Sequence, residues 1–328
     1  MKPTLRYAHG ETLRLFCPQG ECRSNPRSPD FKRPVRHGVF YRSSDRNFVT
    51  RYRCPKCRGT FSSATLHPCF RQKKRQLNFR LWFLLCSKVH QRRVANFLGI
   101  HRTTVARRMI FLGREARLEH ARFLKRYIQA NGRFPDVQFD EMESFEHTKC
   151  KPVSIPLVVS ARSRFVLGVN VASMPAKGPL AKLALRKYGP REDHRVERLV
   201  DTLEKVRSQV HPECRMTSDS HPFYPPIVRQ LYPQVTHVQV KGRKSAIVGQ
   251  GELKKVGFDP IFSLNHTAAM KRDGIGRLVR KTWTTTKKKE RLLDHLYIYA
   301  VWHNQNIWEK LEAKARRARA RAAGAAVA

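Results

Sequence analysis

Two short stretches, FPDVQFD at residues 134–140 and CRMTSD at residues 214–219, decide the fold of the middle of this chain. Each is apolar in the manner of a β-strand, and each ends on an aspartate, Asp140 and Asp219. Acids are scarce here, because 25 Asp and Glu stand against 66 Lys and Arg, which gives a formal net charge of +41. Two acids in matched positions after two strands therefore require an explanation in terms of the fold.

The segments around these strands predict a mixed sheet covered by helices, in the order β-β-β-α-β-α-β-α. In this order the first and fourth strands are neighbours, so we expect Asp140 and Asp219 to lie close enough to share Mg²⁺ or Mn²⁺. The alternative is that each acid simply caps a strand at the surface. The expected elements are strands at 137–145, 151–161, 163–172, 214–219 and 235–242, and helices at 194–210, 224–233, 265–281 and 288–306.

Four of the eight cysteines have metal-ligand spacing. The stretches Cys17-Pro-Gln-Gly-Glu-Cys22 and Cys54-Pro-Lys-Cys57 offer two short loops that could face each other around one zinc ion. We therefore predict a structural zinc ribbon over residues 10–68, with four unligated cysteines as the alternative. The remaining cysteines are expected to be buried free thiols, namely Cys69, Cys86, Cys150 and Cys214.

Residues 72–130 are predicted to form a helix-turn-helix region. In QRRVANFLGIHRTTVARRMIFLG (91–113), Ala95, Gly99 and Val105 have the spacing of a close helix crossing, a turn with positive φ, and a buried β-branched residue. A plain helical hairpin with a solvated basic face is the alternative. The second helix offers side chains suited to phosphate and base-edge contacts: His101, Arg102, Thr103, Thr104, Arg107 and Arg108.

The basic composition points to a nucleic acid as the partner, through neutralisation of phosphates. Hydrophobic residues make up 41% of the chain, which argues against disorder. The sequence has no apolar stretch long enough to span a bilayer, and MKPTLRYAHG lacks the apolar region of a signal peptide, so a cytoplasmic, nucleoid-associated protein is expected. Residues 309–328 are predicted to form a basic Arg/Ala-rich tail.

Four features together resemble bacterial insertion-sequence transposases with a DDE-type, RNase H-like catalytic core. They are the ribbon cysteines, FDEMESFEHTK (139–149), TSDSHPFYPPI (217–227) and LNHTAAMKRDGIGRLVRKTWTTTKKKERLLDHLYIYAVWHN (264–304). The resemblance implies a multidomain protein of α+β and α/β class. Its parts are a small zinc ribbon, a helical helix-turn-helix domain, and an RNase H-like mixed-sheet catalytic domain at 134–308.

The resemblance also implies a third catalytic position on the last core helix. A glutamate is usual there, and the matching residue is Asn265, which can bind a cation through its carbonyl oxygen but brings no charge. Arg272, two helical turns later, matches a basic residue that grips phosphate, together with Lys271. The alternatives for the third acid are Glu252, Glu290 and Asp273, whereas Glu141 should face the opposite side of the strand and Glu143 should lie beyond its useful end.

The implied activity is DNA transposition, in which a strand is cut hydrolytically at the element's end and the freed 3′-hydroxyl then attacks target DNA. Two divalent ions, held by Asp140 and Asp219, would serve the attacking and leaving oxygens. The implied partners are the element's terminal repeats, target DNA and further copies of the chain in a synaptic complex. The alternatives are a non-catalytic DNA-binding repressor or decayed transposase and, from charge alone, an RNA-binding protein. Tyr224 could suggest a tyrosine recombinase, but that class needs an all-helical core.

Overall fold

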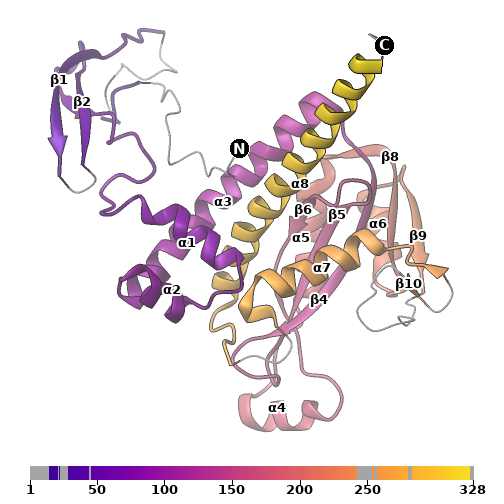
Figure 1. Cartoon of the computed structure of the whole chain (residues 1–328). Coiled ribbons are helices and arrows are strands. Elements are labelled where there is room, and N and C mark those ends of the chain that lie inside the picture. The colour runs from indigo at the N-terminus through magenta and orange to yellow at the C-terminus, as the bar shows by residue number, and fades with distance from the viewer. Residues whose placement is uncertain are drawn as a thin grey trace. The chain divides into compact units, whose positions relative to one another are not determined.

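The computed structural model describes residues 15–20, 22, 29–43, 46–241, 253–254, 257–279 and 283–325. The chain divides into two compact units, one ending at Leu81 and the other beginning at Trp82. Figure 1 shows the helices and strands of both. Within the described ranges no helix is both long and apolar enough to cross a membrane.

The first unit contains a small antiparallel sheet whose strands follow the order β1-β2-β3: β1 (Val35–Arg42), β2 (Asn47–Arg53) and β3 (Thr60–Ser62). Its strands are largely exposed, and Val49 and Phe61 are among the few apolar side chains that are buried within its described residues. Cys17 and Cys54 are buried beside them. So small an apolar core stabilises a fold weakly, and such units usually depend on a metal or a disulfide.

Three helices follow: α1 (Leu77–Cys86), α2 (Gln91–Leu98) and α3 (Arg102–Asn131). Helix α2 ends because Gly99 adopts φ 60° and its N–H bonds to the carbonyls of Ala95 and Asn96. Glycine takes this left-handed conformation without steric cost. Helix α3 is an uninterrupted run of 30 residues and ends at Gly132, directly before the sheet of the second unit.

The second unit is built on a six-stranded mixed sheet in the order β6-β5-β4-β8-β9, with β7 paired to β5. β4 pairs antiparallel with β5 but parallel with β8, which pairs parallel with β9. This confirms the expected mixed sheet with the first and fourth strands adjacent. The strands are β4 (Phe134–Phe145), β5 (Pro152–Ser160), β6 (Val166–Val169), β7 (Ala172–Ser173), β8 (Val210–Asp219) and β9 (Thr236–Val240).

Alternation along β4 directs its side chains to two different layers of helices. Val137 and Phe139 belong to the main apolar cluster with Leu199 and Leu203 of α5 (Arg195–Arg207), which α6 (Tyr224–Leu231) also joins. Gln138, between them in sequence, bonds instead to α7 (Phe262–Gly274). Helices α5 and α7 therefore cover opposite faces of the sheet (Figure 1).

Helices α3 and α8 (Lys289–Ala325) pack side by side along the sheet (Figure 1). They approach closely at Gly113, where an added Cβ would lie 2.5 Å from Cβ of Asp294. Asp294 is buried there and forms an ion pair with Arg117 of α3 at 2.7 Å. The absence of a side chain at Gly113 thus allows two helices far apart in sequence to share one interface.

Several element boundaries differ from those expected. Val210 starts β8 rather than ending a helix, because α5 stops at Arg207. The helix expected at 265–281 ends at Gly274 and is followed by a 3-10 turn, Gly276–Leu278. Most of the expected tail continues α8 as far as Ala325. Helix α4 (Leu180–Tyr188) and the short hairpin β10 (Leu253–Lys254) and β11 (Gly257–Phe258) are additional elements.

Candidate functional site

Asp140 and Asp219 stand at the same level of two neighbouring parallel strands. Phe139 of β4 pairs with Ser218 of β8, and each aspartate is the next residue along its strand. The charge of Asp219 contributes to the raised pKa of Asp140, as expected for carboxyl groups on neighbouring strands. Asp219 is the last residue of β8, whereas β4 continues to Phe145, so only one of the two acids lies at a strand end.

The surroundings of Asp140 disfavour its ionised form. Burial is the largest cause and the charge of Asp219 the second, and together they raise the pKa of Asp140 to about 6. Two donors partly oppose this: Glu141 N–H bonds to Oδ1 at 2.7 Å, and Tyr224 O–H bonds to the same atom at 3.1 Å. Two carboxylates that repel each other in a half-buried site are suited to a divalent cation, which would remove the repulsion.

Tyr224 is part of this site in a way that sequence reasoning did not foresee. Its side chain is almost fully buried, and its ring packs on Phe139 with the centroids 5.0 Å apart. Burial and the charge of Asp140 raise the pKa of Tyr224 far above its ordinary value, so the phenol stays protonated. Its O–H donates a hydrogen bond to Asp140. A buried, protonated phenol that supports a carboxylate is a poor nucleophile, which agrees with setting aside a tyrosine recombinase.

Helix α7 is fastened to β4 two residues before Asp140. The Gln138 side chain accepts a hydrogen bond from Leu264 N–H at 3.0 Å and donates one to the Pro260 carbonyl at 3.1 Å. Alternate residues of a strand share a face, so Gln138 and Asp140 both face α7. This contact brings the first turn of α7, which contains Asn265, to the face of β4 that carries Asp140.

Asp259, which was not predicted, fixes the orientation of the Asn265 amide. It is buried, and its Oδ2 accepts a hydrogen bond from Asn265 Nδ2 at 2.7 Å, while its Oδ1 accepts one from Ile261 N–H at 3.3 Å. The amide NH₂ of Asn265 is the donor in this hydrogen bond, so it points to Asp259. The carbonyl oxygen of Asn265 is then the atom left to contact a cation.

The two basic residues expected to contact phosphate have different environments. Arg272 is half-buried and lies two turns after Asn265 on the same side of α7. Lys271 is 0% exposed, so the expectation that it offsets phosphate charge is wrong. Burial lowers the pKa of Lys271 to about 7, and its Nζ has no hydrogen-bond partner among the described residues. Leu264 and Ala268 precede it at helical spacing on the buried face, which is the sequence signal for its burial.

The alternative third acids lie in other settings. Glu252 falls outside the described residues. Glu290 is in the first turn of α8, where a negative charge favours the helix dipole. Asp273 is exposed and forms an ion pair with Lys88 at 3.1 Å. Asn265 is therefore the candidate that the described structure connects to the face of β4 carrying Asp140.

Two further acids of β4 face other partners. Glu141 Oε1 accepts a hydrogen bond from Ser154 of β5 at 2.5 Å, across the strand pair. Glu143 lies within β4, not beyond it, and its carboxylate is 3.7 Å from the ammonium group of Lys177. Both acids therefore have contacts that do not involve Asp219.

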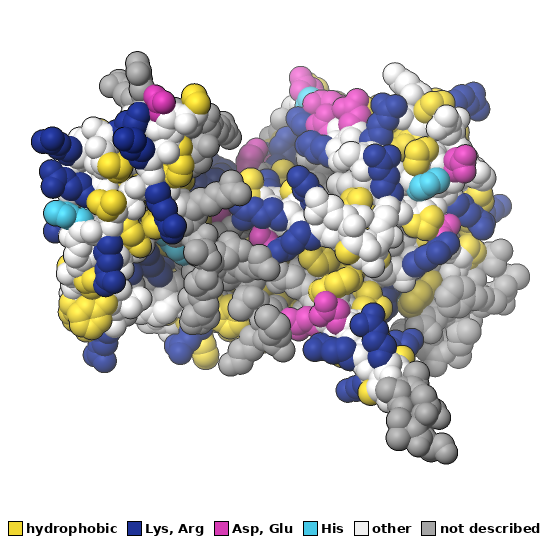
Figure 2. Space-filling model, turned by 90° about the horizontal axis from the view of Figure 1, so that it is seen from above, with side chains coloured by type: hydrophobic (Ala, Val, Ile, Leu, Met, Phe, Trp, Pro, Cys, Tyr) yellow, Lys and Arg dark blue, Asp and Glu magenta, His cyan; other side chains and the backbone are white. Residues whose placement is uncertain are grey.

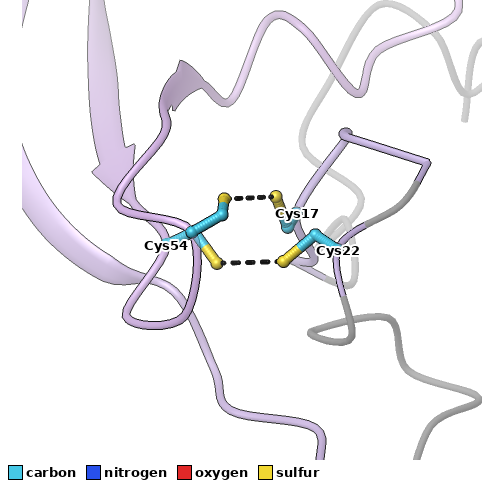
Figure 3. Close-up of side chains that lie close together, drawn as sticks. Cys17, Cys22 and Cys54 are labelled. Carbon is cyan, nitrogen blue, oxygen red and sulfur yellow. Dashed lines mark hydrogen bonds between the residues drawn. The ribbon is translucent and has the colours of Figure 1, made fainter.

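The four predicted ribbon cysteines, Cys17, Cys22, Cys54 and Cys57, converge on one point (Figure 3). Their sulfur atoms all lie within 4.8 Å of one another. The Cys17 and Cys57 sulfurs are 3.5 Å apart, and those of Cys22 and Cys54 are 3.7 Å apart. A tetrahedral zinc site with Zn–S bonds of about 2.3 Å has sulfurs about 3.8 Å apart, so the cluster fits zinc.

The electrostatics of the cluster point in the same direction. Burial raises the pKa of the Cys17 thiol to about 12. Burial also opposes ionisation of Cys54, but the N–H groups of Cys57 and Lys56 outweigh it and lower the pKa of Cys54 to about 6. Four close sulfurs cannot all ionise unless a cation balances them. Four further cysteines are buried and form no disulfide within the described part of the chain, in agreement with the prediction: Cys69, Cys86, Cys150 and Cys214.

The turn between α2 and α3 has the local structure expected from its sequence. Ala95 and Val105 are buried, and Gly99 has positive φ. His101 caps α3, because its Nδ1 accepts a hydrogen bond from Thr103 N–H at 3.3 Å. Of the other predicted contact residues, Arg102, Thr103 and Arg107 are exposed, and Thr104 and Arg108 are half-buried. The role of these side chains in DNA binding stays a prediction.

No protein-family model matches the sequence, and no curated protein matches it. Solved structures with a similar arrangement include the catalytic domain of Mos1 mariner transposase, at 14% identity and a TM-score of 0.24, covering 62% of this chain and 92% of that one. The Mos1 mariner paired-end complex with Mn is 13% identical with a TM-score of 0.27, covering 74% of this chain and 80% of that one.

A third similar structure is a pre-cleavage Mos1 transpososome, at 13% identity and a TM-score of 0.22, covering 72% of this chain and 78% of that one. At such identities and TM-scores these similarities do not assign the chain to a family. The functional argument therefore rests on the residues of this chain.

Proposed function

We propose that this chain is a DDE-type DNA transposase, an enzyme that cuts DNA at the ends of a mobile element and joins those ends to target DNA. The observation that carries the proposal is the pair of carboxylates at one level of two parallel strands, in a chain of net charge +41. A protein that only coats DNA has no use for two mutually repelling acids. Phosphodiester cleavage does, because divalent ions must be held next to the scissile phosphate.

The sheet supports assignment of the second unit to the RNase H-like class. Its order, β6-β5-β4-β8-β9, has antiparallel strands on one side of β4 and parallel strands on the other. This places the carboxyl end of β8 beside the middle of β4, and β9 pairs with β8 on its other side. We propose the same four parts as before: a ribbon at 10–68, a helix-turn-helix region at 72–130, the catalytic domain at 134–308 and the tail at 309–328.

In the proposed site, Asp140, Asp219 and the carbonyl oxygen of Asn265 would hold the metal ions. Magnesium or manganese, when bound there, would lower the pKa of the attacking hydroxyl and stabilise the leaving oxygen. Tyr224 holds Asp140 in place through its O–H, and Arg272 is the proposed contact to a phosphate oxygen. In the first step water attacks phosphorus and a 3′-oxygen leaves as a 3′-hydroxyl. In the second step that 3′-hydroxyl attacks a phosphorus of the target strand, and the P–O bond to the target's 3′-oxygen breaks, which leaves a 3′-hydroxyl on the target.

The remaining parts are proposed to bring DNA to this site. The cysteine cluster would hold one structural zinc ion, and the exposed residues at the start of α3 would contact the terminal repeat. The mobile element is proposed to be a bacterial insertion sequence, and transposition would take place in the cytoplasm on nucleoid DNA. Several copies of the chain would form a multimer that pairs the two ends of the element. Basic side chains spread over the face seen in Figure 2 suit such a polyanionic substrate.

A nicking and strand-transfer assay tests the proposal. The substrate is a supercoiled plasmid that carries the inverted repeats flanking the coding region, incubated with the full chain and Mg²⁺ or Mn²⁺. Asp140→Asn and Asp219→Asn should each reduce nicking by at least about 100-fold. Asp136→Asn is the matched control on the same strand, because it removes only a surface ion pair with Arg162. If the wild type does not nick, or the Asp140 and Asp219 variants nick equally well, the enzyme proposal fails.

Asn265 supports one alternative, a non-catalytic DNA-binding protein derived from a transposase, because a neutral third ligand weakens cation binding. The same assay separates the two functions. A repressor would bind the repeats as tightly as the proposed enzyme in a gel-shift experiment but would give no metal-dependent nicks.

A further inference from the structure

The segment that follows α7 carries the RLVRKTW motif, and the carboxylate site uses none of it. A cavity of about 540 Å³ is lined by Gly276, Arg277 and Trp283 from this part of the chain, by the start of α8, the end of α1 and the helices α2 and α3. All of its lining residues belong to the second compact unit. Its volume is within the range of sites that bind small organic groups, roughly 300–1,000 Å³.

The cavity combines an apolar wall with a free aromatic ring. Leu85, Val89, Ala106 and Met109 form the apolar part of the lining. Trp283 also lines the cavity, yet its side chain is 101% exposed, so almost no protein atom covers its ring. An uncovered tryptophan at the edge of a cavity is available to stack on a flat ligand.

The rim of the cavity is basic. Arg92 and Arg93 line it and form no ion pair within the part of the chain that the structure describes. Lys287, also in the lining, donates its hydrogen bond to the neutral hydroxyl of Thr285 at 3.1 Å. These charges lack acidic partners there, so the rim attracts anions.

The lining also contains one unused hydrogen-bond acceptor. Nε2 of His295 is 2.9 Å from the Leu85 carbonyl, to which it donates, and Nδ1 is buried without a partner among the described residues. Burial and the charge of Arg277 lower the pKa of His295 to about 3, so the ring is neutral and Nδ1 keeps its lone pair. A buried acceptor without a donor is costly unless a ligand or water satisfies it.

We propose that this cavity binds an unpaired base of a DNA strand, with the base stacked on Trp283 and its flanking phosphates contacted by Arg92, Arg93 and Lys287. The proposal rests on the proposed function, which makes DNA the substrate. A fully paired duplex keeps its bases stacked inside and offers phosphates to the rim alone, leaving Trp283 and the apolar wall unused. An unpaired nucleotide uses the ring and the basic rim at once.

Binding of fluorescently labelled oligo-thymidine, compared with a blunt, fully paired duplex of the same length, tests this inference. The full zinc-loaded chain is used without added Mg²⁺ or Mn²⁺, so that cleavage does not interfere. Trp283→Ala should weaken binding of oligo-thymidine by at least about fivefold and binding of the duplex by less than about twofold. Trp283→Phe should retain most of the affinity, because it keeps an aromatic face.

Phe97→Ala is the matched control, since Phe97 is an exposed aromatic residue of α2 outside the cavity lining. It should leave both affinities unchanged, and thermal melting confirms that each variant is folded. The inference is overturned if Trp283→Ala leaves oligo-thymidine binding unchanged or weakens the single strand and the duplex equally. Failure of the proposed function has a different readout: the wild type and Asp140→Asn would nick the plasmid equally.

Discussion

The Asp140 carboxyl group is placed where its own charge is unfavourable. Burial and Asp219 act against ionisation, while Tyr224 and the Glu141 N–H support it only in part. Such a balance destabilises the metal-free fold at neutral pH and favours any cation that binds. A cost in stability at the reacting residues is common in enzymes.

Replacing Asp140 by Asn should therefore stabilise the metal-free protein at neutral pH. The folded-state pKa of about 6 lies above the ordinary 3.8, so the stability linked to this group is present below about pH 4 and is lost as pH rises through 6. The difference corresponds to at most about 3 kcal/mol. Urea unfolding without Mg²⁺ or Mn²⁺ should show a gain of about 1–3 kcal/mol at neutral pH and none near pH 4.

The control is again Asp136→Asn, which should show no such gain. Added Mn²⁺ should stabilise the wild type but not Asp140→Asn. Equal unfolding free energies for the wild type and Asp140→Asn at neutral pH would contradict the strained carboxylate.

Asp259 should matter for metal binding although it is not a proposed ligand. Asp259→Asn leaves one side-chain oxygen where the carboxylate has two. If that oxygen bonds to Ile261 N–H, Asn265 Nδ2 loses its acceptor, so the amide can rotate and present the wrong atom. We expect Mn²⁺ affinity to fall by about 10- to 100-fold, as for other residues that orient ligands. Calorimetric titration measures it, and Asp273→Asn, an exposed acid on the same helix, serves as the control. Unchanged affinity in Asp259→Asn would argue against Asn265 as a ligand.

The sequence predicted that Asp140 and Asp219 lie on neighbouring strands and that four cysteines cluster, because strand order and short ligand spacing are visible in the sequence. Asp259 and Tyr224 could not, because their roles depend on which distant residues the fold brings to them. Tyr224 follows Asp219 in sequence yet bonds to Asp140 on another strand. The fold, not local pattern, selects such partners.

At the level of elements, α7 carries a cost in stability because it buries Lys271. The pKa of Lys271, about 7, lies below its ordinary 10.5. Stability linked to this group is present above pH 10.5 and is lost as pH falls through 7. Lys271→Met should therefore stabilise the protein at pH 7 by up to about 4 kcal/mol, with the gain shrinking towards pH 10.

Urea unfolding at the two pH values measures this effect. Lys310→Met, an exposed position on α8, is the control and should change stability by less than about 0.5 kcal/mol. A pH-independent gain in Lys271→Met would instead indicate a packing effect without a charge contribution.

Helical and strand periodicity predicted the kinds of elements better than their ends. Val210 fits the apolar face of α5 as well as the start of β8, and local pattern does not distinguish these two positions. The close packing of α3 on α8 requires Gly113 to face Asp294, a contact between residues far apart in sequence. No periodicity within either helix specifies that pairing.

For the whole molecule, zinc removal should affect the two compact units differently. Among its described residues the first unit has few buried apolar side chains besides its cysteines. Chelation should therefore expose it to proteolysis while the second unit, from Trp82 onward, stays protected. Cys54→Ser should reproduce the effect and lower the zinc content from one per chain to about none. Cys150→Ala, a buried thiol outside the cluster, should keep its zinc, and loss of zinc there would contradict the assignment.

The net charge predicted a polyanionic partner and the order of elements predicted the mixed sheet, since both are properties of the chain as a whole. The relation between the helical region and the sheet was not predictable in the same way. It arises because α3 continues without a break into the packing of the second unit.

Continuity of α3 has a consequence for where the DNA would be cut. Its 30 residues span about 45 Å, or about 13 base pairs of B-form DNA, from the turn at Gly99 to the strand that carries Asp140. Because the helix has no break, we expect it to fix the distance between the DNA bases bound at its start and the phosphate that is cut. This can be tested by inserting half a helical turn of DNA between the bases that the protein protects and the usual nick. The nicks should stay at a constant distance from the protected bases. If the nicks instead move away from the protected bases by the length of the insertion, α3 does not fix this distance.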